Sequence, residues 1–292
     1  MVVRLTLENV VEQKELVKRL LRSQMVMYGG IDKGGKGTAI KSVRILLESL
    51  GLKGFDIPTY EKEHHDLPQP EQFLGYDFII TAEPGWSGVG LALRMEVLKH
   101  GGESRFDESD PSGVESITLT ELMARNRKYS VQSTAMGFAL DREVRYKRCN
   151  GPARAMGLPV FTERGIESIF YQLVQAHIRG EKISRKWILN LPGNKYALSE
   201  SQKPGLVQLL HCRPEVILND RRRPEKVDDH YFETQKFLQE LDKSYRDPKV
   251  AHFFMSRGIS FSSLDTSDLT VEDTTRRSTE ILLNYLNQQQ ND

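Results

Sequence analysis

The sequence predicts an α/β fold in three layers, with a central, mainly parallel sheet flanked by helices on both faces. Short apolar runs of strand length alternate with segments of helical periodicity along the 292 residues, as expected when crossover helices connect parallel strands. The first apolar run leads into a glycine-rich loop, and an amphipathic segment follows that loop. This length suits one large domain, or one domain with an extension.

The glycine-rich loop runs from Gly30 to Thr38 and fits the pattern G-x-x-x-x-G-K-x-T. Several backbone N–H groups must meet a polyphosphate at once, and only residues without bulky side chains let the backbone come that close. Lys36 is placed to reach the β and γ phosphates. A glycine-rich turn without a ligand is the alternative, which the strand before it and the helix after it disfavour. The loop residues expected at the nucleotide are Gly30, Asp32, Gly34, Gly35, Lys36, Gly37 and Thr38.

Gly37 stands where most such loops carry a Ser or Thr whose hydroxyl contacts Mg²⁺. A bound Mg²⁺ would therefore be held through water or by Thr38. Loops of the adenylate kinase type also read G-K-G-T, so this departure fits a nucleotide kinase.

The first part of the chain predicts two helices around one strand. Helical periodicity opens the chain at about residues 7 to 21, and a strand is expected at 25 to 28. The next helix covers residues 38 to 50 and stops at Gly51. Residues 51 to 76 are rich in Pro, Glu, His and Gln and predict an inserted loop. The apolar stripe of the first helix, which must pack on something, comprises Val10, Val11, Leu16, Val17 and Leu20.

The rest of the chain continues the alternation. Residues 101 to 113 are polar and rich in glycine and acids, and should be exposed. The strands are expected at residues 78–81, 159–161, 206–211 and 259–264, and the helices at 119–156, 166–178, 232–245 and 271–286.

Composition sets limits on the class of protein. The formal net charge is +1, which gives no reason to expect nucleic acid or an acidic membrane as the main partner. The two cysteines, Cys149 and Cys212, lie in no zinc or C-x-x-C spacing, which favours a reducing compartment. No apolar run approaches the roughly 20 residues of a membrane span, and the first residues lack a secretion signal. A soluble cytoplasmic protein is expected.

Several separated motifs occur in an order that resembles thymidylate kinase. GGIDKGGKGT is similar to that family's phosphate loop, including the carboxylate of Asp32. TAEPGWSGVGLALR resembles T-R-E-P-G-G-T-x-x-G-x-x-I-R, and FALDR resembles F-A-A-D-R. Further matches lie in FTERGIESIFYQ, KPGLVQLLHCRPEV and SFSSLDTSDLTVEDT. The resemblance spans about residues 25 to 286.

This resemblance implies a P-loop kinase fold. Residues 1–24 would be an N-terminal helical extension, and residues 25–292 the kinase domain, with insertions near 53–77 and 101–116. The implied reaction transfers the γ-phosphoryl group of ATP to a nucleoside monophosphate, with dTMP to dTDP as the expected case and Mg²⁺ as the metal. The family also implies a homodimer.

The resemblance assigns roles to basic residues and one carboxylate near the phosphates. Lys36 would bridge the ATP phosphates, and Lys33 would reach the transferring phosphoryl group. Arg94 and Arg164 match arginines that hold the acceptor phosphate, where a planar fork suits two oxygen contacts. Asp32 matches the carboxylate that accepts the sugar 3′-hydroxyl.

A second group of residues would line the acceptor base and cover the ATP. Arg142 would donate to the base, although a surface ion pair with Asp141 or Glu143 is the alternative. The arginine run near residue 222 matches a lid over ATP, and a solvated charge run is the alternative. The residues assigned to the acceptor site are Glu83, Phe138, Arg142 and Gln172, and those assigned to the lid are Arg221 and Arg222.

Glu163 and Ala82 leave two possibilities for the acceptor, a nucleoside monophosphate or a nucleoside. Glu163 follows a strand, where a carboxylate meets Mg²⁺ or its water. The sequence Glu163-Arg164 also resembles the deoxynucleoside kinases, whose carboxylate deprotonates a 5′-hydroxyl. Ala82 replaces a family arginine. The alternatives are therefore a deoxynucleoside kinase and a catalytically weak, nucleotide-binding regulatory protein.

Overall fold

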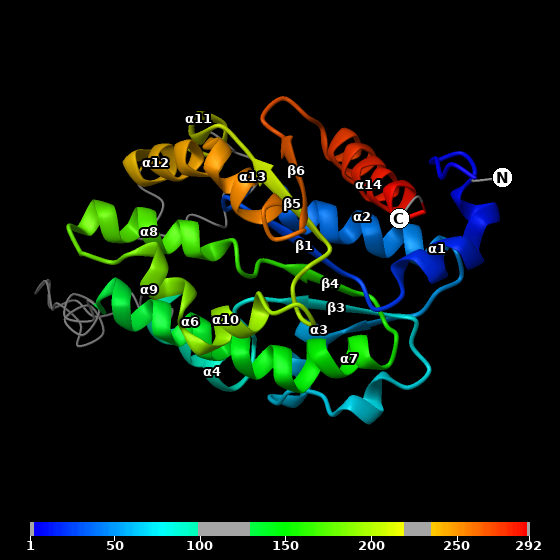
Figure 1. The fold of residues 1–292 in the computed structure, drawn as a ribbon, viewed down its shortest axis with the longest axis horizontal. Helices are drawn as coiled ribbons and strands as arrows, with labels where there is room; N and C mark the ends of the chain where they lie inside the picture. Colours follow the sequence, from blue (N-terminus) through cyan, green and yellow to red (C-terminus); the bar gives the residue numbers. More distant parts are fainter. Residues whose placement is uncertain (1–2, 99–128, 219–234, 291–292) are drawn as a thin grey trace, which may run out of the picture.

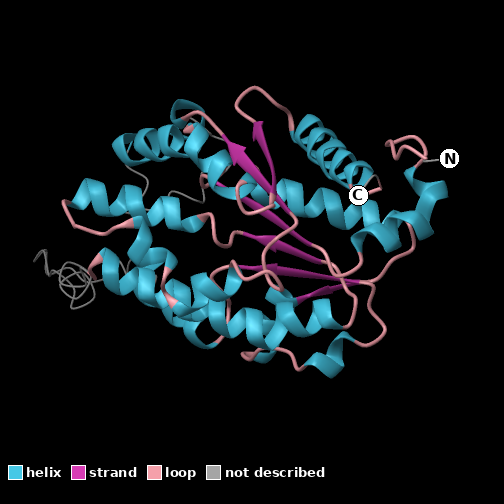
Figure 2. Cartoon of the chain, in the orientation of Figure 1, coloured by secondary structure: helices cyan, strands magenta, loops and turns pink. Residues whose placement is uncertain are grey.

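The computed structural model describes residues 3–98, 129–218 and 235–290, and its centre is a sheet of parallel strands. The strand order is β2-β3-β4-β1-β5-β6, and helices lie on both faces of the sheet (Figure 2). The strands are β1 (Met25–Gly30), β2 (Gly54–Asp56), β3 (Phe78–Ala82), β4 (Val160–Glu163), β5 (Leu206–His211) and β6 (Ser260–Asp265).

The strand order reverses direction at β1. After β1 the chain crosses to β2 at one edge, returns through β3 and β4, and then continues through β5 and β6 on the other side of β1. Tyr28 of β1 is in register with Glu163 of β4, and Gly30 is in register with Leu210 of β5. A ligand of such a sheet binds at the carboxyl ends of the strands, where the order reverses. The glycine-rich loop begins at this point.

Helices cover both faces of the sheet (Figure 1), and they bury its apolar side chains. On one face, α2 and α14 cover Val26, Leu206 and Leu210. On the other face, α8, α12 and α13 cover Val207 and Leu209, while α3, α7 and α10 pack near β2, β3 and β4. The longer helices are α1 (Lys14–Leu21), α2 (Lys36–Ser49), α3 (Ile57–His64), α6 (Val131–Arg145), α8 (Ser168–Arg179), α12 (Gln235–Arg246), α13 (Pro248–Met255) and α14 (Val271–Gln288). The shorter helices are α4 (Gly88–Leu93), α7 (Gly151–Ala155), α9 (Arg185–Leu189), α10 (Pro192–Ala197) and α11 (Pro214–Leu218), with η1 (Val10–Gln13), η2 (Pro70–Phe73), η3 (Arg94–Leu98) and η4 (Tyr146–Asn150).

The N-terminal helix packs on the core of its own chain. Val10 and Val17 are buried, Leu16 is partly buried against the same cluster, and only Val11 of the stripe is largely exposed. Asn287 of α14 donates to the carbonyl of Leu5 and accepts from its N–H, at 2.9 and 2.7 Å. The apolar stripe therefore has its partner within the chain.

The prediction of a loop at residues 51–76 is wrong. This segment contains β2, which pairs with β3, together with α3 and η2. Asp56 caps α3 by accepting a hydrogen bond from the N–H of Thr59 at 2.8 Å, and Pro58 lies in the first turn. The three-residue strand is too short to give a periodic pattern, although the Asp-Ile-Pro-Thr sequence is a helix-start signal. Whether the segment is an insertion in the family stays a prediction.

The other described strands agree with the prediction to within about two residues at each end, a normal uncertainty for element boundaries. The helix expected at 119–156 is seen from residue 131 as α6, η4 and α7. Its first part, the expected exposed segment 101–113, the insertion near 101–116 and the predicted lid lie outside the described residues. No helix in the described ranges is both long enough and apolar enough to cross a bilayer.

Candidate active site

The glycine-rich loop takes a conformation that requires glycine at two positions. Gly30 and Gly35 have φ angles of 128° and 94°. A Cβ atom on Gly30 would lie 2.0 Å from the carbonyl oxygen of Leu210. By contrast, a Cβ on Gly37 would meet nothing within 4 Å, so packing does not exclude a Ser there. The loop ends at the N-terminus of α2, where free N–H groups and the helix dipole favour an anion.

Lys36 lies inside the loop. Its ammonium group donates to the carbonyl of Ile31 at 2.6 Å and lies 3.5 Å from the carboxylate of Asp32, and the residue is 4% exposed. Burial and the charge of Arg164 lower the pKa of Lys36. Lys33, at a left-handed φ of 60°, lies on the exposed side of the loop.

Asp32 forms an ion pair with Arg164 from the turn after β4. Burial opposes the charge on Asp32, but Arg164 and Lys36 outweigh it and hold the pKa of the carboxyl below its usual range. The Arg164 side chain is 19% exposed, and its backbone has a left-handed φ of 66°. Three predicted site residues from two sequence segments therefore lie together.

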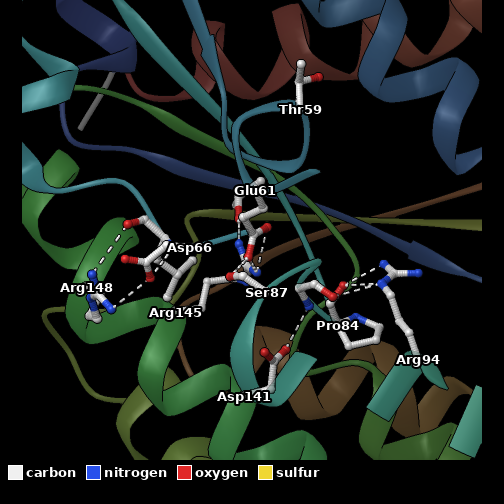
Figure 3. A network of polar contacts seen from close by, with 12 residues as sticks. Thr59, Glu61, Asp66, Pro84, Ser87, Arg94, Asp141, Arg145 and Arg148 are labelled. Carbon is white, nitrogen blue, oxygen red and sulfur yellow. Dashed lines mark hydrogen bonds and ion pairs between the residues drawn. The ribbon is translucent and has the colours of Figure 1, made fainter. Parts of the chain in front are cut away.

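Arg94 is held at the turn that follows β3. Its guanidinium donates to the carbonyl of Pro84 (Figure 3) and to that of Gly85. It also stacks 3.9 Å from the ring centroid of Trp86. Burial and the nearby charge of Arg164 lower the pKa of Arg94 to about 10. The charges of two arginines from distant segments therefore oppose each other, which favours a bound anion in this region.

Arg142 is a buried structural residue in this conformation. It donates to Glu83 at 2.6 and 2.9 Å, to the carbonyl of Gly165 at 2.6 Å and to the hydroxyl of Ser168 at 2.8 Å. It also contacts the amide oxygen of Asn194, and it is 1% exposed. The geometry therefore does not favour the expected contact of Arg142 with a base, or the surface ion pair that was its alternative. Glu83 accepts from Arg142 through Oε2, while its buried Oε1 has no hydrogen-bond partner among the described residues.

Sequence reasoning missed a second buried ion pair, between Arg145 and Glu61 (Figure 3). One nitrogen of Arg145 donates to both oxygens of Glu61 at 2.8 and 3.0 Å, and the hydroxyl of Ser87 donates to Glu61 at 2.7 Å. Arg145 also donates to Thr81 at 3.1 Å. This network fixes the turn that holds Arg94. The available signal was the spacing of Arg142 and Arg145, which places both on one face of α6.

Of the remaining predicted residues, four lie on described helices and strands and two lie outside the described residues. Glu163 ends β4, is partly buried, and lies close enough to influence the charges of Lys36 and Arg94. Phe138 is partly buried on α6. Gln172 is buried on α8, and no described residue donates to its side-chain oxygen. Thr38 lies in the first turn of α2, and Arg221 and Arg222 lie outside the described residues.

Comparison with known proteins supports the fold. No protein-family model matches the sequence, and no curated protein matches it. Among solved structures, a thymidylate kinase from Candida albicans is 16% identical, with a TM-score of 0.54 over 91% of this chain and 93% of that one. A thymidylate kinase from Ehrlichia chaffeensis is 15% identical, with a TM-score of 0.50 over 89% of this chain and 98% of that one. The predicted fold is thus confirmed: the chain has a P-loop kinase fold similar to that of thymidylate kinase.

Proposed function

We propose that this protein phosphorylates a nucleoside monophosphate with ATP, and that its acceptor is dTMP. The observation that carries the proposal is that Arg164 and the turn that holds Arg94 follow two neighbouring strands, β4 and β3, beside the phosphate loop. Two guanidinium groups at this edge of the sheet suit an acceptor that brings its own phosphate. The similar solved structures are thymidylate kinases, which agrees with this substrate class.

The phosphate loop and α2 would bind the ATP. Its glycines bring the backbone N–H groups to the phosphates, and Lys36 would exchange the carbonyl of Ile31 for a phosphate oxygen. Lys33 would approach the transferring group from the exposed side of the loop. We propose that Arg221 and Arg222 close over the ATP and exclude water.

The acceptor would lie against Arg94, Arg164 and Asp32. Both arginines would neutralise the acceptor phosphate, so that the ATP and the acceptor can align for transfer. The protein itself would form no covalent bond to either. Asp32, held ionised by its cationic neighbours, would accept the sugar 3′-hydroxyl. Phe138 and Gln172 would contact the base, while Arg142 and Glu83 hold the surrounding elements in place.

Glu163 and Thr38 fit a Mg²⁺ ion bound with the nucleotide. Mg²⁺ prefers oxygen ligands and is commonly held by one or two protein groups together with phosphates and water. Glu163 offers a partly buried carboxylate and Thr38 a hydroxyl at the start of α2. When bound, the ion would supply positive charge to the transferring phosphoryl group.

A panel of nucleosides and nucleoside monophosphates, with ATP consumption as the readout, tests this proposal. Consumption stimulated most by dTMP supports it. Stimulation by nucleosides alone would instead identify a deoxynucleoside kinase, in which Glu163 is a base. ATP binding without transfer to any acceptor would identify a regulatory protein.

We also propose a cytoplasmic homodimer. The stripe of α1 packs within the chain and gives no support to a dimer through that helix. Light scattering at micromolar concentration should give twice the monomer mass, and a monomer mass would refute the dimer.

A further inference from the structure

Glu167 is a fully buried carboxyl group near the phosphate loop that none of these roles uses. It is the residue before α8, in the turn that begins with Arg164. Glu167 is 0% exposed, and no other residue within the described chain forms a hydrogen bond with either of its carboxyl oxygens. An unpaired, buried carboxyl is costly, and stability alone would favour a nonpolar side chain here.

The side chain of Glu167 occupies space that Gly29 leaves open. A Cβ atom on Gly29 would lie 2.3 Å from Cγ of Glu167 and 2.7 Å from its Cδ. Gly29 lies in β1 directly before Gly30, the first residue of the phosphate loop. The glycine therefore makes room for a carboxyl group at the carboxyl end of the central strand.

Charged groups from several elements face this carboxyl. Burial has the largest effect and raises the pKa of Glu167 to about 7. The charge of Arg164 opposes this increase, so the ionisation of Glu167 depends on where that guanidinium lies. Besides Arg164, the titratable or charged groups that interact with Glu167 are Glu83 directly after β3, Arg142 of α6, Tyr146 of η4, Lys36 of α2 and Tyr245 of α12.

Arg164 has carboxyl neighbours other than Asp32. In this structure it contacts Asp32, whereas Glu167 makes no hydrogen bond with it; the charges of Glu167 and Glu163 raise the pKa of the guanidinium. A substrate whose sugar hydroxyl engages Asp32 would weaken the first pair. Of the other two carboxyls, Glu167 belongs to the same turn as Arg164 and is fully buried, so it can anchor the guanidinium without taking part in metal binding.

We propose that Glu167 is a positioning residue, which holds the guanidinium of Arg164 toward the acceptor phosphate when the substrate engages Asp32. The inference rests on the proposed function for the roles of Asp32 and Arg164. It predicts that Glu167 becomes ionised more readily when the guanidinium of Arg164 leaves Asp32 and lies closer to Glu167.

The kinetic test uses Glu167→Gln, which keeps the shape of the side chain and removes its charge. We expect kcat/KM for dTMP to fall about 10-fold, mainly through kcat, and the pH profile to lose the ionisation of Glu167 while keeping that of the acceptor phosphate. In an Arg164→Ala background, the same exchange should cause no further loss, because the group to be positioned is absent. The matched control is Glu181→Gln, beyond the far end of α8, where the carboxylate accepts from the N–H of Val131 at 2.7 Å and no kinetic change is expected.

A second measurement does not require activity. The Glu167 carboxyl is followed by NMR in protein labelled with ¹³C-glutamate, and Glu167→Gln identifies its signal. Asp32→Asn removes the partner of Arg164, so the titration midpoint of Glu167 should fall by about one pH unit. In the Arg164→Ala background the same exchange removes only the charge of Asp32, and the midpoint should fall clearly less. Equal shifts in both backgrounds, or an additive kinetic loss, would overturn the inference. If no phosphoryl transfer occurs at all, the proposed function fails, and the NMR titration still decides whether Glu167 and Arg164 are coupled.

Discussion

Replacing Glu61 with Ala should destabilise the protein strongly, because it leaves a buried cation without its partner. Glu61 and Arg145 have side chains that are 0% and 1% exposed, and their contacts are 2.8 and 3.0 Å. Removing one partner of such a pair costs about 3–5 kcal/mol. The lost hydrogen bond from Ser87 adds about 1 kcal/mol. Against a total stability of roughly 5–15 kcal/mol for a typical protein, this is a large fraction.

Urea unfolding monitored by circular dichroism measures this loss. The double variant Glu61→Leu/Arg145→Met should recover most of the stability, because it removes both charges together. The matched control is Arg148→Ala, whose partner Asp66 lies at 3.5 Å with side chains 39% and 66% exposed, and which should cost less than about 1 kcal/mol. A Glu61→Ala loss no larger than that of the control would refute the reasoning.

Three further predictions concern the catalytic groups and a neighbouring buried carboxyl. Lys36→Ala should lower turnover by about 10²-fold or more, and unchanged turnover in a folded variant would contradict the role of the loop. Glu163→Gln should raise the Mg²⁺ requirement, with partial recovery at high Mg²⁺; a complete loss indifferent to Mg²⁺ would indicate a base. Burial raises the pKa of Asp141 from 3.8 to about 6, so its protonated form stabilises the fold below about pH 4 and this contribution is lost as the pH rises through 6. In urea titrations, the free energy of unfolding should therefore decrease less between pH 4 and 7 for Asp141→Asn than for the unchanged protein.

Local patterns were sufficient to predict the centre of the fold. The unbroken apolar residues of β1, the glycines after it and the periodicity of α2 are all contained in one short segment. The strand β2 was not predictable in the same way, because three residues carry no period and the pairing with β3 stabilises them.

The side-chain roles depended on contacts between distant segments. The sequence placed Arg142 in a helix, but its partner Glu83 is 59 residues away and that of Arg145 is 84 residues away. Sequence alone therefore did not distinguish an arginine that binds ligand from one that holds the scaffold. Arg94, Arg164 and Asp32 were predicted as site residues from local motifs, whereas the ion pair between Arg164 and Asp32 depends on the strand order.

The most direct test of the proposed function compares dTMP with thymidine as acceptors of the ATP phosphoryl group. Two charged contacts to the acceptor phosphate should favour dTMP by about 100-fold or more in kcat/KM, because thymidine has no phosphate for the two arginines to bind. Arg94→Gln should reduce this preference by lowering kcat/KM for dTMP while leaving thymidine little changed. A higher kcat/KM for thymidine in the unchanged protein would contradict the account and identify a nucleoside kinase.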